Sequence, residues 1–219
     1  MKTRGQALRT PRAAGTAGVV FALLLAAAIV MIRLAIPSEP GKGTGEWLTD
    51  PSRRREVRTA LELVPFAGIS FLWFMGAVRA HIGDAEDKFL ATVFLGSGLV
   101  FVATLFGAAA AAGSLLATAD AAGAEPGGQL WLFGGHFTYG LLTTYSMRMA
   151  AVFIFSTSSI GYRLGVLPRP LTVLGALVGL ALLFMTGSVA WSELAFPLWA
   201  LVVGIHILVR TAANPSGSR

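Results

Sequence analysis

The chain has 219 residues, of which 55% are hydrophobic and only 13% are charged, whereas about a quarter of the residues in a soluble domain are charged. The absence of cysteine excludes disulfides, thiolate metal sites and cysteine catalysis. The net charge of +6 does not indicate nucleic-acid binding, because no basic stripe with interleaved aromatic residues occurs. About 20 consecutive apolar residues cross a bilayer as a helix, so the chain is expected to be an all-α integral membrane protein.

Apolar stretches predict a single membrane domain, residues 14–211, between a basic N-terminal tail, 1–13, and a short polar tail, 212–219. The first stretch resembles a signal peptide, but no small-x-small cleavage site follows it, so we expect an uncleaved span. The six expected spans cover about residues 14–36, 60–78, 89–112, 138–162, 171–191 and 194–210.

The second, third and fourth spans belong to helical patterns longer than the membrane requires. Asp50-Pro51 predicts a helix start, because aspartate caps a helix and proline fits its first turn. Each of the three patterns is about 30 residues long, or ~45 Å, against a hydrocarbon core of ~30 Å. We therefore expect a helical extension outside the membrane, formed by residues 51–60, 110–119 and 129–138.

The distribution of lysine and arginine predicts that both termini lie in the cytoplasm. Basic residues occur in the N-terminal tail, in the turns after spans 2 and 4, and at the C-terminal end, but not in the loops after spans 3 and 5. The loop after span 1 disagrees, because it must lie outside and yet is rich in basic residues. These are Lys42, Arg53, Arg54, Arg55 and Arg58.

Two charged residues fall well inside the spans, where a charge needs a partner or water. Glu62 precedes Arg79 by 17 residues and Arg148 precedes Arg163 by 15, so both are expected ~22–25 Å from the inner face. Because their charges are opposite, we expect Glu62 and Arg148 to form an intramembrane ion pair. The pair is either a substrate or ion site, or a contact that sets the helix register.

Polar side chains near Arg148 extend this candidate site. Tyr145 and Thr144 lie three and four residues before Arg148, and Ser156 and Ser159 follow it at helical spacing. Such a stripe on a membrane helix either lines a wet path or bonds neighbouring helices.

Secondary candidates lie nearer the membrane surface. Arg33 and Glu193 stand at the outer ends of spans 1 and 6, where they either form a polar cluster or reach individually to the interface. His136 lies in the extension. The other histidines, His81 and His206, are expected at different heights, so we expect no metal site and no cofactor.

Small residues in the fifth span indicate a packing surface. Gly175 and Gly179 form a Gly-x-x-x-Gly motif, which permits close helix approach. The motif serves either as an internal face or as an interface with a second copy or another membrane protein. We expect the lipid bilayer to be a partner of the chain and nucleic acid not to be one.

One stretch is similar to a known sequence pattern. Residues 147–153, the serines and threonine at 156–158, and Arg163-x-Gly-Val-Leu-Pro-Arg at 163–169 resemble uncharacterised polytopic bacterial membrane proteins of about six spans. Residues 63–68 and 91–98 are similar to the same proteins, whereas Pro170 departs from the pattern, where tryptophan is expected. The resemblance implies a multi-span fold and no activity.

These observations predict a six-helix bundle in the bacterial inner (plasma) membrane. Without a catalytic motif, the expected role is non-enzymatic and exerted through membrane partners or lipids. One alternative is a small transporter or channel that uses Glu62 and Arg148. Another is an intramembrane lipid-modifying enzyme with Glu62 or His136 as acid or base.

Overall fold

The computed structural model describes residues 10–35, 50–82, 88–122, 129–185, 189 and 191–213, and these residues form helices joined by short turns. The all-α prediction is confirmed for this part of the chain. The elements are α1 (Thr10–Ala35), α3 (Pro51–Ile82), α4 (Lys88–Ala122), α5 (Gln129–Tyr139), the π-helix η2 (Gly140–Ser146), α6 (Met147–Arg163), α7 (Arg169–Phe184), the 3-10 turn η3 (Ser192–Leu194) and α8 (Ala195–Ala213).

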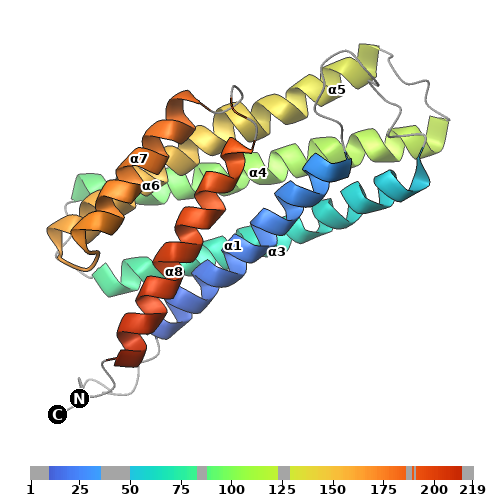
Figure 1. The fold of residues 1–219 in the computed structure, drawn as a ribbon. Coiled ribbons are helices and arrows are strands. Elements are labelled where there is room, and N and C mark those ends of the chain that lie inside the picture. The colour runs from blue at the N-terminus through green and yellow to red at the C-terminus, as the bar shows by residue number, and fades with distance from the viewer. Residues whose placement is uncertain are drawn as a thin grey trace.

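The described residues form six helical paths, because α5, η2 and α6 follow one another without a break. Helix α1 packs against α3 and α8, and α4 packs against α3 and α6 (Figure 1). Helix α7 lies on α6 and touches α8. Helix α4 therefore stands between α3 and the α5–α6 rod along much of their length.

Helix α3 begins where the sequence predicts. The side-chain Oδ1 of Asp50 accepts a hydrogen bond from the backbone N–H of Ser52 at 2.8 Å, and the Asp50 carbonyl accepts from Arg54 at 3.1 Å. Pro51 occupies the first helical position, where its missing N–H costs nothing. The cap explains why the helix starts well before its apolar part.

Helix α7 is shorter than the expected fifth span, residues 171–191. Helix α7 stops at Phe184, so its 16 residues span ~24 Å, less than a ~30 Å hydrocarbon core. Trp191 adopts a left-handed backbone conformation with φ of 68°, which a right-handed helix cannot contain. The 3-10 turn η3 follows immediately and leads into α8.

Within the described ranges, four helical segments are long and apolar enough to cross a membrane, which fits a membrane protein. They are Arg12–Leu34, Pro51–Arg79, Lys88–Asp120 and Ser192–Ala213. Helix α7 is a shorter apolar helix. The expected fourth span, residues 138–162, comprises the end of α5, all of η2 and nearly all of α6.

Aromatic rings fill the centre of the bundle. The Phe71 ring on α3 has its centroid 4.9 Å from those of Phe21 on α1 and Phe153 on α6, and 5.0 Å from that of Phe101 on α4. Phe196 on α8 lies 5.0 Å from Phe101. Rings from five helices thus close the middle of the molecule.

Many large apolar side chains point outward instead. Examples on separate helices are Leu23, Trp73, Leu99, Leu177 and Val202, all exposed. A soluble domain rarely shows so wide an apolar surface, whereas a lipid-facing surface requires it.

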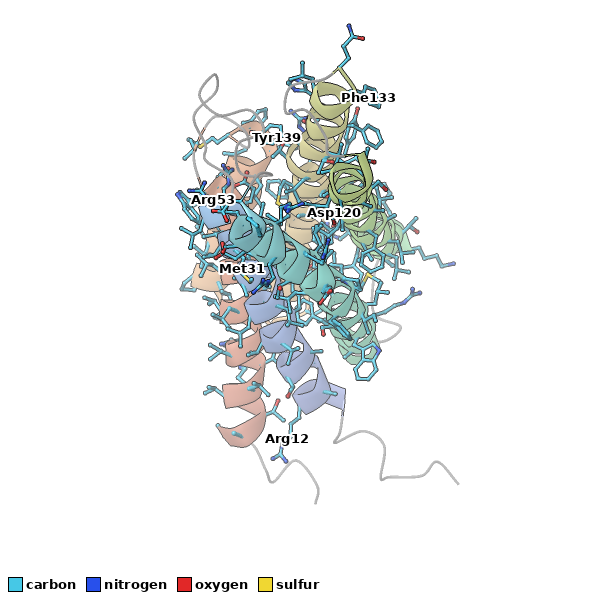
Figure 2. All side chains as sticks on the ribbon, turned by 90° about the vertical axis from the view of Figure 1, so that its right-hand side faces the viewer. Arg12, Met31, Arg53, Asp120, Phe133 and Tyr139 are labelled. Atoms are coloured by element: carbon cyan, nitrogen blue, oxygen red, sulfur yellow. The ribbon has the colours of Figure 1, made fainter. Side chains whose placement is uncertain are left out.

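Residues 51–60, 110–119 and 129–138, which were predicted to form a helical extension, all lie within helices. In Figure 1 the ends of α3, α4 and α5 project together at the right of the view, beyond the other helices. Figure 2 looks onto this end, with Arg53, Asp120 and Phe133 labelled on the three helices. Asp120 joins α4 to α3 through ion pairs with Arg54 at 2.7 Å and Arg58 at 2.6 Å.

Parts of the predicted organisation lie outside the described residues. These are most of the N-terminal tail, the C-terminal tail from residue 214, and the loop of residues 36–49 with Lys42.

Candidate functional site

Glu62 and Arg148 do not meet, so the predicted ion pair is wrong. Glu62 is exposed on α3 and has no ion pair with any described residue. Arg148 is exposed on α6, where its Nη1 donates to the Thr144 carbonyl at 3.4 Å, within its own helical rod. The structure therefore separates the two charges on which the transport hypothesis depends.

The helices are offset along their axes, which explains the error. Gly98 on α4 faces both Met75 on α3 and Phe153 on α6, so these residues share one level. Glu62 precedes Met75 by 13 residues but Arg148 precedes Phe153 by only five, a difference of ~12 Å at 1.5 Å per residue. The predicted depths were counted from Arg79 and Arg163, and they agree only if these two residues lie in one plane.

Double substitution of the two charges checks this separation. Glu62→Gln and Arg148→Met, singly and combined, are expected to change the free energy of unfolding in detergent by less than about 0.5 kcal/mol each, and additively. Both side chains are exposed and neither bridges two helices. A coupling above about 1 kcal/mol in the double variant would show that the charges interact after all.

The polar stripe near Arg148 is divided by the π-helix. Tyr145 points outward and is exposed, and Thr144 is half-buried. Ser156 is buried and donates to the Val152 carbonyl of its own helix. The cross-helix contact instead comes from Ser146, whose hydroxyl donates to Thr104 on α4 at 2.8 Å. The hydroxyl of Ser146, next to the predicted stripe, therefore bonds a neighbouring helix.

Arg33 and Glu193 lie together. Arg33 Nη2 is 2.5 Å from Glu193 Oε1, which ties the end of α1 to η3. Glu193 is 1% exposed, while the Arg33 side chain is 22% exposed. Glu193 Oε2 is also buried, and no described residue donates a hydrogen bond to it. The pair is the most deeply buried ion pair among the described residues.

Because Glu193 is more deeply buried than Arg33, losing one partner is expected to cost more than losing the other. A carboxylate removed from water costs several kcal/mol unless a cation and hydrogen bonds compensate. Here a single guanidinium supplies that compensation. Arg33 lies in the last turn of α1, and its long side chain stays partly exposed. Glu193 therefore needs Arg33 to neutralise its charge more than Arg33 needs Glu193.

A groove between α3 and α4 contains Glu62. It has a volume of about 390 Å³ and is open on one side. Its charged walls are Arg58, Glu62 and Asp120, and its apolar walls are mainly Leu61, Pro65 and Leu116. Arg58 donates from Nη2 to Asp120, and Glu62 has no such partner among the described residues. The groove thus presents both signs of charge beside an apolar surface.

The two histidines whose side chains are described lie on different helices. His136 is exposed on α5 and His206 lies on α8, and the described residues contain no group of three potential ligands. The side chain of His81 lies outside the described residues.

The Gly-x-x-x-Gly motif of α7 packs inside the monomer. Gly175 faces Ser158 on α6 and Trp199 on α8, and Gly179 faces the Phe155 ring. The Ser158 hydroxyl and the Trp199 Nε1 are both buried at this crossing. The motif's small face is therefore used by the neighbouring helices of the same chain.

Comparisons with protein families, with curated proteins and with solved structures find no match to this chain. Functional conclusions therefore depend on the geometry described above.

Proposed function

We propose that the chain is a multi-pass protein of the bacterial inner membrane that acts without catalysis, through lipids or membrane partners. The observation that carries this proposal is the wide, exposed apolar surface that surrounds a closed aromatic core. An apolar exterior around an apolar core is stable in lipid, where apolar surface costs nothing and backbone groups are paired within helices.

The filled core favours this role over transport. A conducting path needs polar groups or water through the bundle, but the central level is occupied by Phe71 and its ring neighbours. Acid-base catalysis in which Glu62 and His136 act together is disfavoured, because the two residues lie on α3 and α5, with α4 between them at the extension.

The proposed topology places both termini in the cytoplasm and the helical extension outside. This topology can be measured by labelling introduced cysteines. Because the chain contains no cysteine of its own, only the introduced thiol reacts with the label. Ser52→Cys marks the exposed start of α3, and Ala213→Cys marks the exposed end of α8.

In spheroplasts, a membrane-impermeant maleimide is expected to label Ser52→Cys at once and Ala213→Cys only after permeabilisation. Alkaline carbonate should leave both variants in the membrane pellet. Labelling of the two sites in the opposite order would reverse the topology, and release by carbonate would rule out membrane integration.

A further inference from the structure

The α3–α4 groove holds a balanced set of charges at the junction between the helical extension and the apolar part of α3. Asp120 is shared by two guanidiniums, those of Arg54 and Arg58, so this cluster carries one net positive charge. The carboxylate of Glu62, which has no ion pair with a described residue, lies one helical turn from Arg58 and balances that charge. A ligand that fits the groove therefore carries one positive and one negative group.

Arg58 is the anion-binding side of the groove. Its side chain is 57% exposed, and among the described residues its guanidinium donates only to Asp120, at 2.6 Å. The remaining N–H groups are available, and the planar fork suits the oxygens of a phosphate. Glu62, about 6 Å away at i+4, is an acceptor-only group suited to a hydrogen-bond-donating ammonium.

An exposed apolar strip leads away from the groove along α3. Phe66, Ile69 and Trp73 follow Glu62 at spacings of four, three and four residues, so all four residues share one helix face. These three side chains are exposed, with Trp73 72% exposed. Charged groups of both signs thus stand at one end of a continuous apolar strip, which matches the layout of a phospholipid.

We infer that the α3–α4 groove binds the headgroup of a zwitterionic phospholipid with a primary amine, phosphate on Arg58 and ammonium on Glu62. The acyl chains lie along Phe66, Ile69 and Trp73. A primary ammonium donates hydrogen bonds to the carboxylate, whereas a quaternary choline cannot. An anionic headgroup without an amine leaves Glu62 unpaired and repelled. The inference rests on the proposed membrane location.

Lipid retention tests the inference. The full-length protein is reconstituted in vesicles with equal amounts of phosphatidylethanolamine, phosphatidylcholine and phosphatidylglycerol of identical acyl chains. After detergent release, co-purifying lipid is measured by native mass spectrometry. Phosphatidylethanolamine is expected to be retained at least about threefold over each of the others, the ratio that a partly exposed charge pair supports. Equal retention, or a preference for phosphatidylglycerol, overturns the inference.

Matched variants identify the groove. Glu62→Gln is expected to reduce the retention of phosphatidylethanolamine to that of phosphatidylcholine, because the carboxylate charge is lost. Glu56→Gln is the control, since it makes the same change on an exposed part of α3 outside the groove. An unchanged preference in Glu62→Gln, or an equal loss in Glu56→Gln, contradicts the assignment.

The phosphate side is tested in the same way. Arg58→Gln is expected to lower retention of both zwitterionic lipids, while Arg55→Gln, outside the groove, retains them. Helicity and monodispersity are measured for each variant. Because Glu62 is exposed and forms no ion pair within the described part of the chain, Glu62→Gln remains a valid test even where Arg58→Gln disturbs the contact with Asp120. Release of the chain by carbonate refutes the proposed location itself, whereas stable insertion without lipid preference refutes only this binding site.

Discussion

Replacing Arg33 by methionine is expected to lower the free energy of unfolding by about 3–5 kcal/mol, because it leaves the Glu193 carboxylate buried without a cation. Glu193→Leu should cost less, about 1–2 kcal/mol, since Arg33 is partly exposed at the end of α1 and can turn towards the headgroups. Combining both substitutions replaces the ion pair by apolar groups and is expected to restore stability to near that of the original chain.

Unfolding in mixed detergent and dodecyl sulfate, followed by circular dichroism, measures these differences. Arg12→Met is the matched control, because Arg12 lies on the same helix, is exposed and has no ion pair with a described residue. Its effect should stay within about 0.5 kcal/mol. If Arg33→Met is as stable as the original chain, or the double variant is no better than Arg33→Met, the pair does not compensate the buried carboxylate.

Gly204→Ala should destabilise the crossing of α1 and α8 by about 1–3 kcal/mol. A methyl group at Gly204 lies 3.0 Å from the Gly15 carbonyl oxygen and 3.1 Å from the Val19 amide nitrogen. Because both neighbours are backbone atoms, α1 and α8 can relieve the overlap only by moving apart. Gly15→Ala meets the Gly204 carbonyl oxygen at 2.9 Å and should act similarly.

Gly96→Ala is the control for this crossing. Gly96 is exposed on α4, and nothing lies within 4 Å of an added methyl group. Alanine favours the helix more than glycine does, so this variant is expected to be unchanged or more stable by up to about 1 kcal/mol. The same denaturation measurement applies. A Gly204→Ala protein as stable as Gly96→Ala would mean that the two helices are not in such close contact.

Helix positions were predictable from the sequence where one local signal determines them. The Asp50-Pro51 cap marks the start of α3, and the apolar length of α4 gives its extent to within a few residues. Arg33 and Glu193 were assigned to the same level because each stands at the end of a span, beside a turn. A short distance from a span end leaves little room for error in depth.

Features that depend on how helices slide along one another were not predictable. The positions of Glu62 and Arg148 within their helices are correct, but their relative height depends on packing at Met75, Gly98 and Phe153. The spacing of apolar residues in the sequence determines which face of its own helix a side chain occupies. It does not determine how far a neighbouring helix is shifted along its axis. The groove was missed for the same reason, since Asp120 and Glu62 come from different helices.

The π-helix at residues 140–146 sets the orientation of one half of a long rod independently of the other. Each hydrogen-bonded turn of a π-helix contains one residue more than an α-turn, and one residue corresponds to ~100° of rotation. Deleting a residue from this segment would therefore swing the stacked rings of Phe133 and Phe137 around the axis while α6 stays in place. The π-helix thus determines which face of α5 meets α4 at the projecting end.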